Sequence, residues 1–206
     1  MRGVDYNATH MVKAVKGLDL NPNAYTYVTV DGKQRRIADS NKDDSIDWFA
    51  AWAAAQIDAL GTRPKVLLPI PSSKTIANSP ETYRTFMLAE AIAKRVKSCT
   101  ISSALRFVEA RPSSREEGGS RDPKVLYPNM TLIKTLPVGQ IVLIDDVMTS
   151  GGHLIASSWK LADKNRSPAL ALACGRSIDV QLDDPFSVPA EEVDIARQDD
   201  DEDIFG

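Results

Sequence analysis

Apolar runs of strand length alternate along the chain with segments whose apolar residues recur at helical spacing. The strand-length runs are residues 65–70, 99–105, 141–144 and 169–174. The segments with helical spacing are residues 48–60, 79–96 and a stretch that begins near Gly152. This alternation predicts an α/β protein with a parallel sheet flanked by helices. Because ligands bind at the carboxyl ends of parallel strands, we expect the loops after Ile70, Leu105 and Ile144 to surround one crevice.

The first part of the chain has a different pattern. Residues 1–23 predict an irregular lead with a short helix around residues 11–15. Residues 25–30 then alternate between apolar and polar positions, as in a half-buried strand. Asp31-Gly32 is a strong hairpin-turn signal, so residues 33–38 are predicted to return as the partner strand.

Capping residues suggest where the first two long helices begin and end. Ser45 and Asp47 are alternative N-caps for the first of them, and Gly61 suits its C-terminal end. Ser79 is a good N-cap for the second, with Pro80 at its first helical position.

The most informative stretch lies in the second half of the chain. The apolar run 141–144 is followed by Asp145 and Asp146, where we expect the strand to end. A polar turn leads from there into the next helix, and its residues are Thr149, Ser150, Gly151, Gly152 and His153. Glycines permit close approach of a ligand, and free backbone N–H groups at a helix start favour an anion. Carboxylates accept hydrogen bonds from a ribose diol, so the stretch predicts a ribose 5-phosphate site with room for a divalent cation.

Residues 141–153 resemble the phosphoribosyl pyrophosphate (PRPP) motif of type I phosphoribosyltransferases. That motif has four apolar residues, two acids, an apolar residue, any residue, Thr, Thr or Ser, Gly, any residue and usually Thr. The chain departs from it at His153, where a hydroxyl residue is usual. Pro69-Ile70-Pro71 is similar to the Pro-x-Pro run of the ComF-like branch of the family.

The resemblance implies both a fold and a reaction. The fold would be Rossmann-like, with a small variable hood over a phosphoribosyltransferase core. The reaction would transfer the phosphoribosyl group of PRPP to a nucleobase-like nitrogen acceptor, with release of pyrophosphate and with Mg²⁺ as cofactor. Asp145 and Asp146 would be catalytic, close to the Mg²⁺ that PRPP carries, and Thr149 to His153 would bind the 5-phosphate. The resemblance allows a homodimer.

Two further loops are predicted to complete the site. The first would hold pyrophosphate and consists of Pro71, Ser72, Ser73 and Lys74; the alternative is a plain connection with a surface lysine. The second is the long polar stretch 106–130, of a length typical of functional loops. Its cations are Arg106, Arg111, Arg115, Arg121 and Lys124. In the family, a mobile loop at this place closes over the reacting centre, so Arg115 and Arg121 are assigned to catalysis; the alternative is a solvated loop.

Composition narrows the class of protein. The chain has 206 residues, 43% hydrophobic and 26% charged, which suits one soluble domain. It has no apolar run of about 18 residues and no secretory signal, so we expect no membrane partner. Cys99 and Cys174 are predicted to be buried thiols in a reducing compartment, which favours a cytoplasmic location. Residues 191–206 carry eight acids and one base, a net charge of −7, so the rest of the chain is +4 against a total of −3. A mildly basic body suits an anionic small molecule.

The sequence divides into three parts. Residues 1–44 form an N-terminal extension with the hairpin, residues 45–178 form the core, and residues 179–206 form a C-terminal segment with an acidic tail. Candidates for the hood that selects the acceptor are the hairpin and residues 179–188, which include Phe186. Either could instead pack against the sheet edge or a dimer partner.

Four other classes of protein compete with a transferase. A regulatory protein that keeps the fold as a PRPP sensor stays open, because of His153 and the unusual 71–74 loop. A nucleic-acid partner is disfavoured, since the chain has no dense basic cluster with aromatic residues. A Walker loop is excluded because Gly151-Gly152-His153 lacks the required lysine, and a receiver domain would carry its paired acids near its start.

Overall fold

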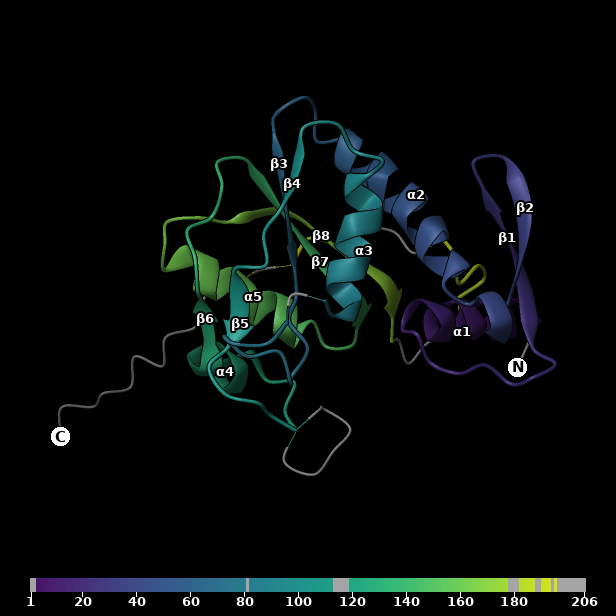
Figure 1. Cartoon of the computed structure of the whole chain (residues 1–206), viewed down its shortest axis with the longest axis horizontal. Helices are drawn as coiled ribbons and strands as arrows, with labels where there is room; N and C mark the ends of the chain where they lie inside the picture. Colours follow the sequence, from purple (N-terminus) through teal and green to yellow (C-terminus); the bar gives the residue numbers. More distant parts are fainter. Residues whose placement is uncertain are drawn as a thin grey trace.

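A four-stranded parallel sheet lies at the centre of the molecule (Figure 1). The computed structural model describes residues 3–80, 82–112, 119–177, 182–187, 190–193 and 195. The strands follow the order β4-β3-β7-β8, and they are β4 (Cys99–Ile101), β3 (Lys65–Pro69), β7 (Gln140–Met148) and β8 (Pro168–Arg176). Helices cover both faces, so the predicted α/β class is confirmed, and the arrangement is compatible with a Rossmann-like fold.

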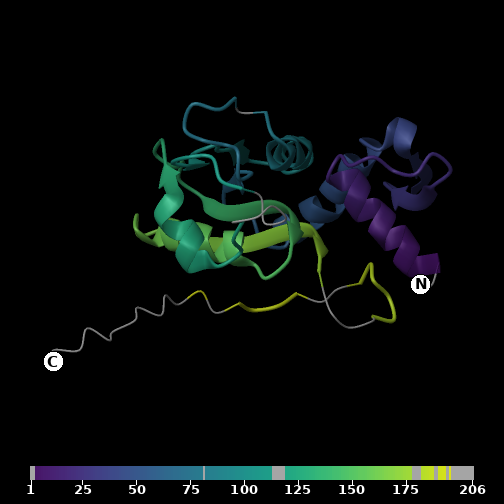
Figure 2. The same cartoon turned by 90° about the horizontal axis from the view of Figure 1, so that it is seen from below.

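Alternation along the two central strands assigns each side chain to one of two cores. Leu67, Val142 and Ile144 pack against α2 (Asp44–Asp58) and α3 (Arg84–Ala93). Leu68 and Leu143, on the opposite face, pack against α5 (Gly152–Ala162). Figures 1 and 2 show these helices on the two sides of the sheet. Both faces of β3 and β7 are therefore buried, which explains why their sequences are continuously apolar.

The hairpin prediction is confirmed residue for residue. β1 (Tyr25–Val30) pairs antiparallel with β2 (Lys33–Ala38). Asp31 and Gly32 both have positive φ, 51° and 74°, as in the tight turns that suit strand twist. Val28, Val30 and other inward residues form a small core with α1.

The N-terminal lead differs from the prediction. α1 covers Gly3–Val15, rather than a short helix around residues 11–15. Its buried residues, His10, Met11, Ala14 and Val15, lie only in its second half. The apolar residues of the first half, Val4, Tyr6 and Ala8, stand at every second position rather than at helical spacing, so the pattern there gave no helical signal.

Two predicted caps are wrong. α2 begins at Asp44, so Ser45 and Asp47 lie inside its first turn, where the Ser45 hydroxyl donates to the Lys42 carbonyl. α3 begins at Arg84 rather than next to Ser79. The Ser79 hydroxyl instead accepts a hydrogen bond from the Ile76 amide at 2.9 Å and so belongs to the preceding turn.

The predicted strand at 99–105 is two strands. β4 joins the main sheet, and β5 (Leu105–Phe107) pairs antiparallel with β6 (Met130–Leu132) in a separate small sheet. The long stretch 106–130 therefore contains structure of its own, including α4 (Pro123–Leu126) and the short helix η2 (Tyr127–Asn129). Another short helix, η1 (Asp39–Asn41), follows the hairpin. Residues 113–118 lie outside the described part.

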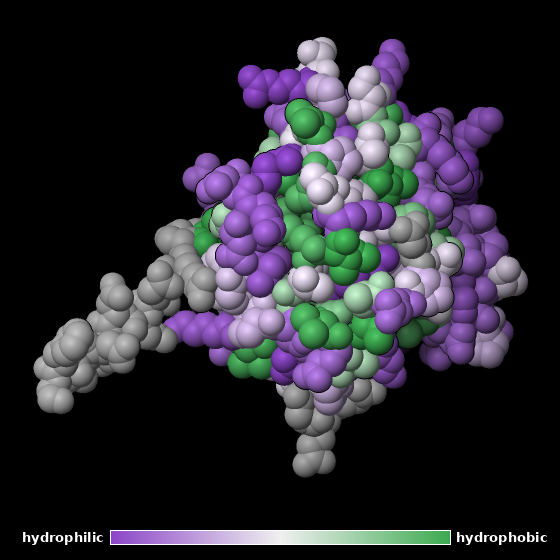
Figure 3. All heavy atoms as spheres, turned by 60° about the vertical axis from the view of Figure 1, so that its left-hand side comes forward, coloured by the Kyte–Doolittle hydropathy of each residue, from purple (hydrophilic) through white to green (hydrophobic). Residues whose placement is uncertain are grey.

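Two further features concern the surface of the molecule and its two cysteine thiols. Within the described residues, no helix has both the length and the apolar character that a membrane crossing needs. On the face that Figure 3 shows, hydrophobic groups are separated by hydrophilic ones. Cys99 and Cys174 are free and half-buried rather than fully buried, and burial raises their pKa values to about 11 and about 12.

Close packing of α1 on the last strand of the sheet gives a first prediction. A Cβ atom added at Gly175 would lie 2.6 Å from Cγ2 of Val12. Gly175→Ala should therefore displace α1 and lower the free energy of unfolding by about 1–2 kcal/mol. Urea denaturation measures this change. In the double variant Gly175→Ala/Val12→Ala the clash is absent, so the two costs should not add; full additivity would contradict the contact.

Candidate functional site

A cavity of about 280 Å³ lies at the carboxyl ends of β3 and β7. The structure brings together there the three loops that were expected to surround one crevice. Its walls also include residues from the end of α1 and the start of α3. The lining residues are Lys16, Ile70, Pro71, Ser72, Ser73, Tyr83, Arg84, Thr85, Phe107, Arg111, Pro112, Ser120, Arg121, Leu126, Asp145, Asp146, Val147, Thr149, His153 and Ser177.

The cavity opens because one side of β7 loses its partner. The β3–β7 pairing ends at Pro69 and Ile144, and the last hydrogen bond runs from the Ile70 amide to the Ile144 carbonyl at 2.9 Å. Pro71 has no N–H group with which to continue the ladder. β7 itself continues to Met148 because β8 still pairs with its other edge. The expectation that the strand ends before Asp145 is therefore wrong.

Asp145 and Asp146 lie in this one-sided part of β7, and both half-buried side chains line the cavity. The Asp146 amide donates to Oδ1 of Asp145 at 2.8 Å. Nζ of Lys16 lies 3.9 Å from Oδ2 of Asp146. Burial, and then the negative charge of Asp146, raise the pKa of Asp145 to about 7, while the Asp146 amide and Lys16 act in the opposite direction. The pair therefore holds a proton that one isolated carboxyl group would have lost.

This raised pKa predicts a pH dependence of stability. Between its ordinary value of 3.8 and about 7, Asp145 binds more protons in the folded chain than in the unfolded chain. The stabilisation present at low pH is therefore lost as pH rises through about 7. Melting temperatures of the ligand-free wild type and Asp145→Asn should diverge with rising pH, the variant becoming relatively more stable. Asp58→Asn, on exposed α2 surface, should run parallel to wild type; parallel curves for Asp145→Asn as well would contradict the assignment.

The turn after β7 leads into α5 as predicted. Gly151 is the N-cap of α5, with a φ of 78° and no side-chain cap. The amide of Ile155 bonds to the Gly151 carbonyl at 3.0 Å, so the amides before it have no partner within the helix. Of the described residues of this turn, Thr149 and His153 line the cavity, and Ser150, Gly151 and Gly152 do not.

His153 and Arg121 border the start of α5. The ring of His153 meets the ring of Phe107 edge-on at 6.2 Å between centroids, and burial lowers the pKa of His153 while Asp146 acts to raise it. The Ser150 hydroxyl lies 3.5 Å from the Arg121 carbonyl oxygen. A Cβ atom added at Gly152 would lie only 1.7 Å from that oxygen. Arg121 is thus packed closely on the amino end of α5.

The loop predicted to hold pyrophosphate lies only partly in the cavity. Pro71, Ser72 and Ser73 line it, whereas Lys74 is exposed and is not among the lining residues. The Ser72 and Thr75 hydroxyl groups are 2.7 Å apart. The amide of Phe107 donates to the Thr75 carbonyl at 3.0 Å, and that of Arg111 to the Ser73 carbonyl at 2.8 Å. Strand β5 and the residues after it therefore fix the loop from behind.

Cations around the cavity come from places that sequence reasoning missed. Lys16 follows α1, and Arg84 begins α3. Arg84 donates to the carbonyls of Ala14 and Val15 and forms an ion pair with Asp43 at 2.9 Å. This fixes the end of α1 beside the cavity. No local motif marks Lys16, because its position depends on a contact between distant segments.

The remaining residues that the sequence assigned to the site or to the hood differ in where the structure places them. Arg111 and Arg121 line the cavity, while Arg115 lies outside the described residues. The hairpin contributes none of the described lining residues. In the other hood candidate, Phe186 packs edge-on against Trp48 at 6.1 Å, and residues 179–181 and 188 lie outside the described part.

The described side chains at this site could hold a metal ion only together with oxygen atoms of a bound substrate. The described residues include no group of three or more His, Cys, Asp or Glu side chains that could hold one. Mg²⁺ is commonly held by one or two carboxylates together with substrate phosphates, and Asp145 with Asp146 fits that pattern.

The chain matches no model of a known protein family and no curated protein sequence. Fold and site thus define an α/β protein with an acid pair and a helix start at one cavity.

Proposed function

We propose that the protein is a type I phosphoribosyltransferase. It binds PRPP and transfers the phosphoribosyl group to a nitrogenous base with release of pyrophosphate. One observation carries the proposal: Asp145, Asp146 and the first turn of α5 border the same cavity at the carboxyl edge of the sheet. A ligand with a phosphate and a neighbouring diol meets both features, because helix starts bind anions and carboxylates accept from hydroxyl groups.

Each charged or polar group of the substrate has a complementary surface in the cavity. The 5-phosphate lies at the start of α5 with the Thr149 hydroxyl, and the ribose diol faces the acid pair. The pyrophosphate faces Pro71 to Ser73, where Lys16, Arg111 and Arg121 supply positive charge in place of Lys74. Mg²⁺, brought with PRPP and held jointly by its oxygens and the acid pair, would offset the negative charge of the pyrophosphate.

In the reaction the bond between ribose C1 and the pyrophosphate oxygen breaks, and a bond from C1 to the acceptor nitrogen forms. Pyrophosphate leaves with the electron pair, so positive charge develops at C1 and the ring oxygen. The positive charge at C1 favours the ionised form of Asp145, so this carboxylate and Asp146 both stabilise that charge, and the cations stabilise the leaving group. Excluding water from the cavity protects C1 from hydrolysis.

A PRPP sensor without turnover is the second candidate. Two departures favour it: His153 stands where the motif usually has a hydroxyl residue, and Lys74 lies outside the cavity. Both reduce the contacts available to the substrate phosphates without removing the backbone amides. Such a protein would bind PRPP but release no pyrophosphate.

One experiment separates these candidates. PRPP with Mg²⁺ is titrated by calorimetry, and purine and pyrimidine bases are then tested in turn for pyrophosphate release. Binding with release for one base supports the transferase, and tight binding without release for any base supports the sensor. No binding of PRPP overturns both.

The cation assignment predicts a contrast between two lysines. Lys16→Met should weaken PRPP binding about tenfold, because it removes a charged partner of the ligand or of the acid pair. Lys74→Met removes the same charge from an exposed position outside the cavity and should change the dissociation constant by less than about twofold. Calorimetry at constant ionic strength measures both. Equal losses would place the pyrophosphate near Lys74, against the assignment.

A further inference from the structure

Lys16 makes a contact with the acid pair that the proposed reaction does not explain. Its Nζ atom lies 3.9 Å from Oδ2 of Asp146, and the two side chains are only 24% and 23% exposed. This distance is longer than a hydrogen bond between charged groups. The two groups therefore attract each other without a hydrogen bond, so a competing cation has no hydrogen bond between them to break.

The main chain fixes Lys16 at the edge of the cavity. Its amide donates to the Val12 carbonyl at 3.0 Å, which continues the last turn of α1. The next residue, Gly17, has a φ of 73°, and its amide donates to the Ala14 carbonyl at 2.8 Å. This left-handed turn ends the helix, so the backbone of Lys16 has little freedom to move.

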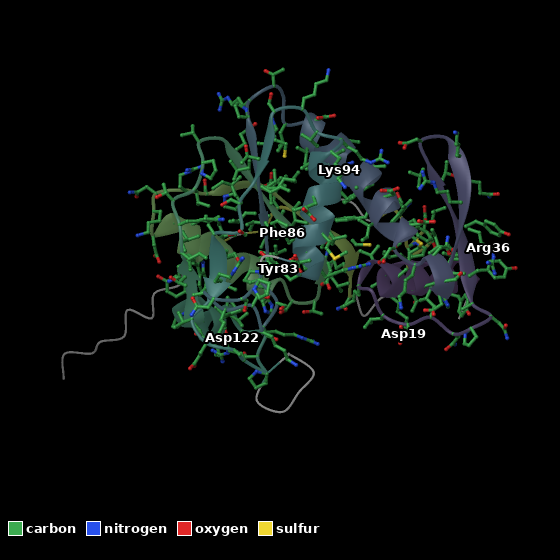
Figure 4. The ribbon with its side chains drawn as sticks, in the orientation of Figure 1. Asp19, Arg36, Tyr83, Phe86, Lys94 and Asp122 are labelled. Atoms are coloured by element: carbon green, nitrogen blue, oxygen red, sulfur yellow. The ribbon has the colours of Figure 1, made fainter. Side chains whose placement is uncertain are left out.

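Arg84 holds this end of α1 from the neighbouring helix. It donates to the carbonyls of Ala14 and Val15. In Figure 4 the end of α3 that Tyr83 marks faces this end of α1. A Cβ atom added at Gly17 would lie 3.4 Å from the Arg84 guanidinium group. The flexible side chain of Lys16 is therefore the part of this contact that can change partners.

Lys16 neutralises only one of the two charges that the acid pair can carry. Asp145 and Asp146 both line the cavity, and the Asp146 amide orients the Asp145 carboxylate at 2.8 Å. A divalent cation that entered alone would meet the Lys16 ammonium group at the same carboxylate. Three arginine side chains also line the cavity: Arg84, Arg111 and Arg121. Like charges repel strongly in a partly enclosed site, so a metal ion alone must first displace Lys16.

A pyrophosphate group changes this balance. Lys16 lines the same cavity as Pro71, Ser72 and Ser73, where the pyrophosphate is proposed to lie. Phosphate oxygens carry more negative charge than one carboxylate and are strong acceptors for an ammonium group. When Lys16 turns to the pyrophosphate, Asp146 becomes open to the metal ion that PRPP carries.

We propose that Lys16 is a positioning residue that exchanges partners. It neutralises Asp146 in the ligand-free cavity and moves to the pyrophosphate when PRPP binds, so a divalent cation reaches the acid pair only together with PRPP. This inference rests on the proposed function, because the second partner is the pyrophosphate group. The acid pair then selects the metal complex of PRPP over the free metal ion.

Mn²⁺ alone is the first probe, because its binding to the whole chain is measured directly by electron paramagnetic resonance. At about pH 8, where Asp145 is ionised, Lys16→Met should bind Mn²⁺ about tenfold more tightly than wild type. Lys16→Arg keeps the charge and should bind Mn²⁺ as weakly as wild type. The double variant Lys16→Met/Asp146→Asn should lose the gain, which locates the ion at the acid pair. Melting temperatures check that each variant is folded.

PRPP with Mg²⁺ is the second probe, titrated by calorimetry. Lys16→Met should weaken this binding about tenfold, while the same substitution tightens the binding of Mn²⁺ alone. Opposite changes in the two affinities are the signature of a partner exchange. A merely structural role of Lys16 would lower both affinities together.

The matched control is Lys13→Met, which removes the same charge from an exposed position in the last turn of α1. It should leave both affinities unchanged. Mn²⁺ binding no tighter in Lys16→Met than in wild type would overturn the inference, as would an equal gain in Lys13→Met or in Lys16→Arg. If Lys16→Met gains affinity for Mn²⁺ but the wild type binds no PRPP, the proposed function and the partner exchange both fail, and only the neutralising contact is supported. If PRPP binds and the affinity for Mn²⁺ does not change, the inference fails alone.

Discussion

Replacing Asp145 and Asp146 together by Asn should lower the rate of pyrophosphate release by about a thousandfold, the loss typical when preorganised transition-state charge is removed. Amides keep the shape of the carboxylates but carry no charge to offset the positive charge at ribose C1. The fold should survive, because both side chains line a cavity and the charge of Asp145 is already disfavoured there. Initial rates with saturating PRPP and the best acceptor base measure the effect, and melting temperature checks the fold.

Asp58→Asn serves as the matched control, because it removes an acid from the exposed end of α2. Its turnover should equal that of wild type. Full activity in the Asp145→Asn/Asp146→Asn chain, or its failure to fold, would show that the acid pair has another role.

Gly152→Ala should be the most damaging single substitution to the cavity. The added Cβ would lie 1.7 Å from the Arg121 carbonyl oxygen, and both partners are backbone, so neither can turn away. The residues around Arg121 must leave the start of α5 or the helix must shift, at a cost of about 3 kcal/mol, the upper end for overpacking. We expect a lower urea midpoint and a loss of ribose 5-phosphate affinity measured by calorimetry.

Gly3→Ala gives the comparison, because a Cβ there meets nothing within 4 Å in a helix of the same chain. It should leave stability and affinity close to wild type. If Gly152→Ala is equally harmless, Arg121 does not pack on α5 in solution.

Local chemistry explains which elements the sequence predicts well. Asp31-Gly32 satisfies a turn that needs positive φ at both positions, so the hairpin and its register follow from a few residues. The apolar run before Asp145 and the glycines after it define a strand, a turn and a helix start in the same way. Alternation of strands and helices then predicts the parallel sheet.

Contacts between distant segments explain the differences. β7 extends past Asp145 because β8 pairs with it, and no property of residues 145–148 alone shows this. Ser79 has the residue type of an N-cap, but its hydroxyl bonds to Ile76 instead. Lys16 reaches the cavity only because Arg84 holds the last carbonyls of α1, across 69 positions of sequence.

The close packing of α1 on Gly175 also has a consequence for folding during synthesis. Val12 lies in α1 and leaves the ribosome well before Gly175, which lies in β8. Until β8 has been synthesised, the hairpin, α2 and Arg84 can already contact α1, but the surface around Gly175 on which α1 packs is missing. The cavity is therefore completed only after β8 has been synthesised, and a nascent chain stalled before residue 168 should carry a folded hairpin but no competent site.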